Sequence, residues 1–356
     1  MQPTAQEVQT TVSLAQSYEK AKAADPGARS RDIADRLGVT EGMLADARIG
    51  PTVKRLALQG AEFATLLRSL RAVGPVMTLT RNEAAVHETT GEIGEVEEFG
   101  VMGQITGAID LRLFFRHWHA GYAVSEETKS GLRHSIQVFD AAGTAVLKVY
   151  ATGASDLSTW HRLVGEHTAQ NAQIVAFSPA EAGPEDVPDE EIDRAVLRRE
   201  WTALQHSHDF HRMLRELGVG REQALRLAGE DLAWRADIGI VERVLQGAAK
   251  GAVPIMCFVG NPGCLQIYAG PVQQISVMGP WLNVLDPGFN LHLRTDRVAS
   301  AWVVLKPTQM RGRITSIELF DSRSTMICQI FGDRPPGEGE RESWRSLVAD
   351  TSIGAA

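Results

Sequence analysis

The sequence is poor in cysteine and has no motif built from it. Among its 356 residues the only cysteines are Cys257, Cys264 and Cys328. Three cysteines are too few for a disulfide framework or for a four-cysteine zinc site. The run Cys-x-x-Cys-His is absent, which excludes covalent attachment of a c-type haem.

Long hydrophobic runs and glycine-rich phosphate loops are also missing. No stretch approaches the roughly 18–20 apolar residues that a membrane-spanning helix needs. The segment from Met1 to Lys22 is polar, unlike a secretory signal, so we expect a cytoplasmic protein. No Gly-x-Gly-x-x-Gly joins a strand to a helix, and no Gly-x-x-x-x-Gly-Lys-Ser/Thr occurs. These absences disfavour nucleotide binding of both kinds.

An excess of positive charge is absent as well. Lys and Arg number 36 and Asp and Glu 44, which gives a formal net charge of −8. Residues 30–44 have the pattern of a helix–turn–helix, so a DNA-binding regulator is a remote alternative. Its recognition segment, Thr40–Arg48, carries Arg48 as its single basic residue. Nucleic acid is therefore disfavoured as a partner, because phosphate contacts need several cations.

An internal repeat is present. Leu37-Gly38-Val39 recurs as Leu217-Gly218-Val219, an offset of 217 − 37 = 180 residues. Ser135-Ile-Gln-Val-Phe-Asp140 recurs as Ser316-Ile-Glu-Leu-Phe-Asp321, an offset of 316 − 135 = 181. Offsets this constant over such a span indicate two copies of one domain.

The predicted organisation is a first repeat over 1–177, a linker over 178–191 and a second repeat over 192–356. The linker contains three prolines and six acidic residues, typical of an exposed connector. In each copy we expect a helical segment (8–70 and 192–248), a strand-rich segment (75–150 and 254–332) and a terminal helix (155–170 and 339–349). Helices grouped before short strands in series predict an α+β fold with antiparallel sheets.

The two copies differ most in a segment rich in histidine. Residues 200–214 are predicted to form one helix that carries His206, His208 and His211. Helical spacing places four residues on one stripe that we expect to face the sheet: Leu204, His208, His211 and Leu214. Three interpretations stay open. The two inward histidines are a hydrogen-bonded core pair, a solvated helix edge, or ligands of a metal or of haem iron.

A bound haem also needs cations for its two propionates. Arg221 is expected on the same helical segment, 13 residues after His208. Lys306 and Arg334 are expected at strand or turn ends, and Gln329 on a strand. Arginine suits bidentate binding of a carboxylate, whereas lysine supplies a point charge.

Three longer motifs carry a resemblance to a known family. They are Phe258-Val-Gly-Asn-Pro-Gly-Cys-Leu-Gln-Ile267, Met278-Gly-Pro-Trp-Leu-Asn-Val-Leu-Asp-Pro287 and Phe289-Asn-Leu-His-Leu-Arg294. The sequence resembles the cytoplasmic hemin-binding proteins of bacterial haem uptake, the HemS/ChuS/PhuS/HmuS family, also called hemin-degrading factors. The resemblance covers nearly the whole chain. It implies two similar α+β halves, each with a large antiparallel sheet and flanking helices, related by a pseudo-twofold.

The resemblance also implies a site for haem b in the second half. It assigns His208 as the axial iron ligand and His211 as an alternate ligand. Arg112 is implied as the distal arginine from the first half. The implied propionate group is Arg221, Lys306, Gln329 and Arg334. Phe331 stands where some relatives carry tyrosine, and His87 stands where some have a histidine proposed to bind a second haem.

The implied function is haem binding in uptake and iron utilisation, with transfer to a haem oxygenase or storage. The main alternative is an enzyme that opens the macrocycle, with Arg112 on the distal side and electrons from an external donor. The implied partners are haem, a haem oxygenase and the haem-uptake ABC transporter. The chain is expected to be a monomer or a homodimer.

Overall fold

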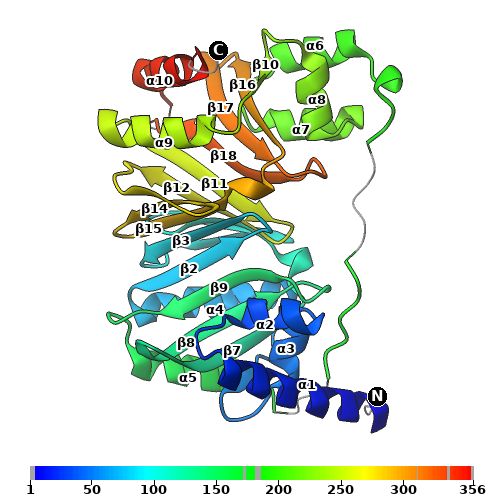
Figure 1. The fold of residues 1–356 in the computed structure, drawn as a ribbon, viewed down its shortest axis with the longest axis vertical. Coiled ribbons are helices and arrows are strands. Elements are labelled where there is room, and N and C mark those ends of the chain that lie inside the picture. The colour runs from blue at the N-terminus through cyan, green and yellow to red at the C-terminus, as the bar shows by residue number, and fades with distance from the viewer. Residues whose placement is uncertain (1–4, 171–173, 181–185, 311, 335–336, 354–356) are drawn as a thin grey trace. The chain divides into compact units, whose positions relative to one another are not determined.

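The computed structural model describes residues 5–170, 174–180, 186–310, 312–334 and 337–353 (Figure 1). The chain folds into two compact units, and each contains one short segment from the other half of the sequence. Unit 1 is Met1–Arg81, Glu88–Glu181 and Gly260–Gln266, and unit 2 is Asn82–His87, Ala182–Val259 and Ile267–Ala356.

The first half of the chain has five α-helices among its described residues: α1 (Ala5–Ala24), α2 (Ser30–Leu37), α3 (Glu41–Ala47), α4 (Phe63–Leu70) and α5 (Leu157–His167). Its strands are β1 (Val53–Arg55), β2 (Val76–Arg81), β3 (Ala85–Gly91), β4 (Val96–Phe99), β5 (Met102–Ile105), β6 (Asp110–Phe114), β7 (Ala120–Thr128), β8 (Gly131–Phe139) and β9 (Ala145–Ala151).

The second half repeats this order. Its helices are α6 (Arg194–Thr202), α7 (Asp209–Leu217), α8 (Arg221–Ala228), α9 (Ile240–Gly251) and α10 (Glu342–Ile353). Its strands are β10 (Ala233–Ala236), β11 (Ile255–Asn261), β12 (Cys264–Gly270), β13 (Ile275–Met278), β14 (Trp281–Asp286), β15 (Phe289–Arg294), β16 (Ser300–Thr308), β17 (Gly312–Phe320) and β18 (Met326–Gly332).

The strands form two nine-stranded sheets. Within unit 1, antiparallel pairs join β1-β7-β8-β9-β2 and β4-β5-β6. Within unit 2, the corresponding pairs join β10-β16-β17-β18-β11 and β13-β14-β15. The predicted α+β class with large antiparallel sheets is confirmed. The edge strands β1 and β10 were not predicted, since runs of three or four residues carry little periodicity of their own.

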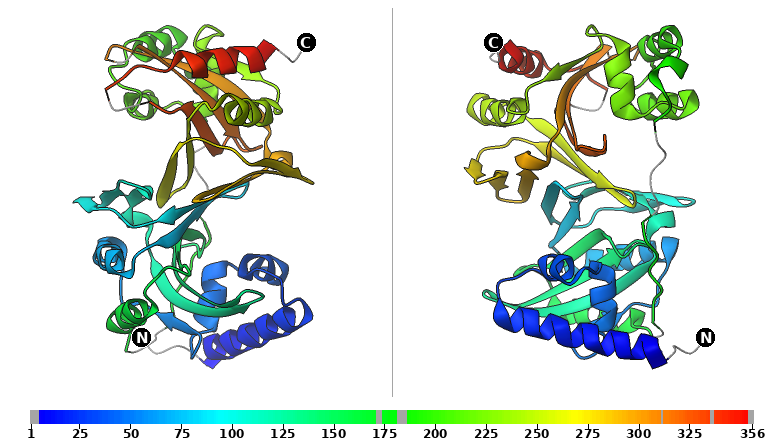
Figure 2. Two further views of the ribbon diagram at one scale, coloured as in Figure 1. Left: turned by 90° about the vertical axis from the view of Figure 1, so that its left-hand side faces the viewer. Right: turned by 45° about the vertical axis from the view of Figure 1, so that its right-hand side comes forward.

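In unit 2 the strands β16, β17 and β18 are covered by helices on both faces (Figures 1 and 2). Helices α9 and α10 pack on one face, where Ile317 and Leu319 are buried with Trp344. Helices α6, α7 and α8 pack on the other face, around Trp201, Phe210 and Phe320. Alternation along β17 therefore sends successive side chains into different helical layers.

The repeated Leu-Gly-Val motif has a structural cause. Gly38 ends α2 and Gly218 ends α7, both with left-handed backbone, at φ 67° and φ 62°. The following valine amide reaches back into the helix, Val39 N–H to Ala34 and Val219 N–H to Leu214, each at 3.1 Å. Glycine is favoured there because other residues pay a steric penalty at positive φ.

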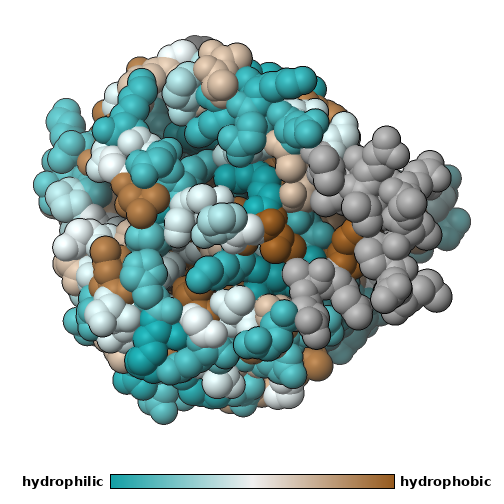
Figure 3. All heavy atoms as spheres, turned by 90° about the horizontal axis from the view of Figure 1, so that it is seen from below, coloured by the Kyte–Doolittle hydropathy of each residue, from teal (hydrophilic) through white to brown (hydrophobic). Residues whose placement is uncertain are grey.

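The predicted repeat boundaries at 177 and 191 stay predictions, and linker residues 181–185 lie outside the described residues. The remaining linker residues are mostly exposed, with a short 3₁₀ turn at Asp189–Glu191. On the face that Figure 3 draws, apolar side chains are scattered among polar ones. Such scattering is ordinary for a surface in water.

Candidate functional site

The predicted helix over 200–214 is two helices joined by a turn. Helix α6 ends at Thr202 and α7 begins at Asp209. The start of α7 has a local cause, because the Asp209 carboxylate accepts the backbone N–H of His206 at 2.9 Å. Such a side-chain-to-backbone bond satisfies an amide at the start of a new helix. The prediction of one continuous helix is therefore wrong, and Leu204 lies in the turn.

His208 and His211 lie at the start of α7, and both are exposed. The face of α7 that is buried carries Phe210, Met213 and Leu214 instead. The expectation that the two histidines face the sheet is wrong, because α7 starts a fresh helical phase at Asp209. The two imidazoles are still neighbours, since residues three apart share one side of a helix.

His211 has an electrostatic link to the next helix. Partial burial lowers the pKa of His211, and the positive charges of Arg221 and Arg215 lower it further. These effects favour the neutral imidazole, which is the form that binds a metal.

A buried ion cluster lies directly behind α7. Both oxygens of Glu318 accept from Arg221, with Nε to Oε2 at 2.7 Å and Nη2 to Oε1 at 2.8 Å. Lys306 Nζ donates to Oε1 of the same carboxylate at 2.7 Å and to Ser316 Oγ at 3.1 Å. The Glu318 side chain has an exposed fraction of 0%. One carboxylate therefore joins two of the predicted site cations.

Two positional predictions are corrected by this cluster. Arg221 is the first residue of α8, a separate helix from the one that carries the histidines. Lys306 lies inside β16, opposite Ile314, rather than at a strand or turn end, and its side chain is 3% exposed. The interior position follows from pleating, which alternates Lys306 and Val304 with residues of the other face.

The aromatic ring of Phe210 connects the cluster to α7. Lys306 Nζ lies 4.9 Å from its centroid and Arg221 Cζ lies 5.0 Å from it. Both distances are within the range of a cation–π contact. Because Phe210 lies between His208 and His211 in the sequence, the start of α7 is held next to both cations.

A half-buried apolar floor continues from the cluster across β18 and β11. The Phe331 ring lies 5.4 Å from Lys306 Nζ and 5.2 Å from the Phe258 ring, which it meets edge-on. Gln329 pairs with Glu318 on one side and with Phe258 on the other. These three floor residues are intermediate in exposure. The structure thus brings together four of the predicted site residues: Arg221, Lys306, Gln329 and Phe331.

Glu318 is the member of this cluster that the sequence analysis missed. A signal was present, because Glu318 is an acidic residue inside a strand-like run, Ile314–Phe320, where strand alternation places it on one face with Ser316 and Phe320. Burial alone would raise the pKa of Glu318, but Arg221 and Lys306 outweigh burial and hold that pKa below its usual range. Burial lowers the pKa of Lys306 to about 8, despite the opposing effect of Glu318.

Arg334 and Arg112 are not placed in this cluster by any described contact. Arg334 follows β18, and its charge acts on Glu340, which accepts from Thr315 Oγ1 at 2.9 Å. Arg112 belongs to unit 1, where it lies on β6 and pairs with Asp110. Its side chain is 34% exposed.

His87 lies in the core of unit 2. Its exposed fraction is 0%, and its ring lies 5.0 Å from that of Phe289. Among the described residues, no side chain or carbonyl makes a hydrogen bond of good geometry to either ring nitrogen. Burial lowers the pKa of His87 to about 3, so the ring is neutral. This environment is that of a packed core histidine.

The corresponding place in the first half carries different charges. The seventh residues of β7 and β16 correspond, as do the seventh residues of β8 and β17 and the first residues of α3 and α8. At these three positions the first half has Glu126, Gln137 and Glu41. The second half has Lys306, Glu318 and Arg221 at the corresponding positions.

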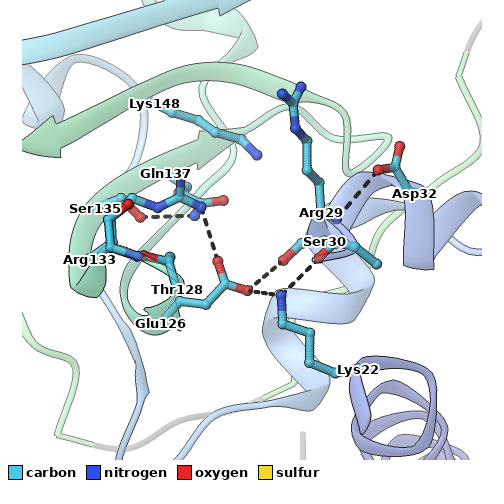
Figure 4. Close-up of polar contacts among 12 residues, drawn as sticks. Lys22, Arg29, Ser30, Asp32, Glu126, Thr128, Arg133, Ser135, Gln137 and Lys148 are labelled. Carbon is cyan, nitrogen blue, oxygen red and sulfur yellow. Dashed lines mark hydrogen bonds and ion pairs between the residues drawn. The ribbon is translucent and has the colours of Figure 1, made fainter. Parts of the chain in front are cut away.

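In unit 1 the chain supplies partners for these two acids itself. Glu126 accepts from Tyr18 of α1 at 2.9 Å and lies 3.7 Å from Lys22 and 3.3 Å from Arg133. Figure 4 shows Lys22 and Arg133 around Glu126, with Lys148 and Gln137 on the neighbouring strands. Glu41 is held by Arg81 and by Lys148, the latter at 2.6 Å. Burial alone would raise the pKa of Glu41, but Lys148 and Arg81 lower it to about 2.

The segment with helix–turn–helix character is α2 and α3. In α3 five residues are buried: Glu41, Gly42, Leu44, Ala45 and Asp46. Arg48 stacks on the Tyr18 ring, with 3.7 Å from Cζ to its centroid. A recognition helix must present its side chains to a groove, so α3 does not fit the role of a DNA-reading element.

The sequence of a known domain matches both halves. The family model for the haemin-degrading HemS.ChuX domain matches residues 38–167 and 218–351. The chain belongs to this family. Hemin transport protein HmuS of Yersinia pestis is 37% identical over 339 residues, which are 95% of this chain and 96% of that relative.

Two solved structures of the family are similar over nearly their whole length. Holo-PhuS, a heme-binding protein from Pseudomonas aeruginosa, is 43% identical with a TM-score of 0.91, covering 95% of this chain and 98% of its own. The heme degrading enzyme ChuS of Escherichia coli O157:H7 is 34% identical with a TM-score of 0.88, covering 96% and 99%. Among the described residues, no helix is long and apolar enough to span a membrane.

Proposed function

We propose that this chain binds haem in its second half, in the cytoplasm of a bacterium that takes up haem for its iron, and transfers it to a haem oxygenase or stores it. The observation that carries the proposal is the cluster of Arg221, Lys306 and Glu318 behind α7. In this part of unit 2, cations, exposed imidazoles and half-buried aromatic rings lie within one layer.

These residues fit the chemistry of haem, which is a flat apolar ring with an iron at its centre and two carboxylates at one edge. A single neutral imidazole is a sufficient axial ligand, and His208 is our proposed ligand, with His211 as the alternate. The described residues contain no cluster of three or more metal-ligating side chains, which is consistent with iron held by the porphyrin. Bound haem would supply the iron chemistry, while the chain binds and orients it.

The other proposed contacts follow the polarity of the ligand. Phe331 and Phe258 offer apolar surface to the ring, and Gln329 offers an amide beside them. Arg221 is the proposed propionate contact, because its side chain is 23% exposed and can reach a ligand. Lys306 is almost wholly buried, and its proposed role is to supply positive charge from the interior side of the site.

The experiment is a haem titration followed at the Soret band. We expect wild-type protein to bind haem, and His208→Ala to lose at least tenfold in affinity and to change the ferric spectrum. His206→Ala is the matched control, because His206 is an exposed histidine in the same turn. Unchanged affinity and spectrum in His208→Ala would reject His208 as the ligand. Absence of saturable binding by wild type would reject the function.

Haem degradation is a second candidate function, favoured by the membership of ChuS in the same family. In this form Arg112 would be the distal donor and electrons would come from an external reductant. The test is an aerobic absorbance series of the haem complex with reductant, in the presence and absence of catalase. Turnover that persists with catalase and is lost in Arg112→Ala supports an enzyme. Turnover that catalase abolishes supports binding and transfer alone, because free peroxide then causes the breakdown.

A further inference from the structure

Glu318 has no role in the proposed contacts with haem, yet it is the centre of the buried cluster. Its side chain is fully buried and accepts from Arg221, Lys306 and the Ser316 hydroxyl, the last at 3.0 Å. A buried carboxylate is unfavourable unless it is paired and hydrogen-bonded. Glu318 satisfies that condition only by keeping both cations in place.

The pairing fixes the direction of the Arg221 guanidinium. Nε and Nη2 both donate to Glu318, a bidentate geometry that sets the plane of the group. Guanidinium has five N–H donors, so three remain for a second acceptor. Because Arg221 is also stacked near Phe210, those donors are presented next to the start of α7.

The first half of the chain is a natural comparison. Where Lys306 and Arg221 are replaced by Glu126 and Glu41, the place of Glu318 is taken by the neutral amide Gln137. The Gln137 side chain donates to Ser135 Oγ at 2.9 Å, and Ser135 corresponds to Ser316 (Figure 4). The fold therefore accommodates an amide at this strand position, and the carboxylate occurs where the two cations occur.

We infer that Glu318 is a positioning residue, which holds Arg221 and Lys306 in the orientation that receives the propionate carboxylates of haem. This inference rests on the proposed function. Two cations and one anion leave one net positive charge, so the cluster still attracts a dianionic ligand. Glu318 holds the two cations in one geometry before the ligand binds. Less conformational entropy of their side chains is therefore lost on binding.

The experiment compares haem with haem dimethyl ester, which has the same ring and iron but no free propionates. Wild type is expected to prefer haem by about tenfold or more, as for loss of a charge-assisted hydrogen bond. In Glu318→Gln the preference is expected to fall to within about threefold, with ester affinity and the Soret maximum unchanged. A role limited to stability would lower binding of both ligands equally and leave their ratio unchanged.

Two further variants complete the design. Arg221→Gln is expected to lose the preference as well, and it provides the test should Glu318→Gln fail to fold. Gln137→Glu alters the corresponding strand position of unit 1 and is expected to keep the wild-type ratio. A full preference for haem in Glu318→Gln or in Arg221→Gln would overturn the inference, as would an equal loss of both ligands. Failure of wild type to bind either ligand would instead reject the proposed function.

Discussion

Glu41 and Arg221 occupy the same position in the two halves of the chain, the first residue of a helix that follows a Leu-Gly-Val turn, and they carry opposite charges. Each is a member of a buried or partly buried ion cluster. Glu41 binds Lys148 and Arg81, whereas Arg221 binds Glu318. The duplicated fold thus uses one helix start to place a carboxylate in one half and a guanidinium in the other.

The first prediction is a haem stoichiometry of one per chain. In unit 1 the positions of the two cations hold Glu41 and Glu126, whose own partners are cations of the chain, and Tyr18 of α1 covers Glu126 and is only 2% exposed. Titration of the chain with haem, followed by difference absorbance and by calorimetry, should reach its end point at one equivalent. A second saturable equivalent of comparable affinity would show that this reasoning is wrong.

The second prediction concerns the exchange of ligands between His208 and His211. If both can bind iron, His211→Ala should change the equilibrium affinity for haem by less than about threefold, because His208 remains. It should slow transfer to an acceptor such as apo-myoglobin, since the step through a neighbouring ligand is lost. Stopped-flow absorbance measures this rate, with Glu216→Ala, at an exposed position of the same helix, as the control. An unchanged transfer rate would argue against the exchange.

The third prediction is energetic coupling between Lys306 and Glu318. Lys306→Met alone should lower the free energy of unfolding by roughly 3 kcal/mol, because it leaves a buried carboxylate with one cation fewer. The double variant Lys306→Met/Glu318→Gln should cost less than the sum of the single changes, with a coupling energy of about 1–3 kcal/mol. Urea denaturation of the four proteins measures this cycle. Additive losses would mean that the two groups act independently.

The fourth prediction is an acid sensitivity caused by His87. Its folded pKa of about 3 lies below the ordinary value of 6.5, so the unfolded chain binds more protons between these values. Stability is therefore lost as the pH falls below 6.5, by up to about 1.4 kcal/mol per pH unit. Between pH 7 and pH 4, the free energy of unfolding of His87→Leu should therefore fall by roughly 3 kcal/mol less than that of wild type.

Thermal or urea unfolding at the two pH values measures this effect. His206→Leu, at an exposed position, is the control and should follow wild type. Equal acid sensitivity of His87→Leu and wild type would show that His87 is already able to take up a proton in the folded state.

Much of the fold was predictable because it depends on local pattern. The duplication could be read from offsets of 180 and 181 residues, and the strand-rich segments 75–150 and 254–332 from short strands in series. The helix over 200–214 was mispredicted for a local reason too. Asp209 binds back to His206, and this hydrogen bond caps the start of a second helix. Helical periodicity does not report such a bond.

The sequence by itself determined the α+β class, the repeat and the set of residue types available for a haem site. It did not determine which charges meet. Glu318 is separated by 97 residues from Arg221 and by 12 from Lys306, and only the packing of α8 and β16 against β17 brings them to one point. A buried carboxylate takes its partners from whatever side chains the fold places within about 3 Å. The tertiary structure therefore decided that the two predicted cations have an internal anion between them.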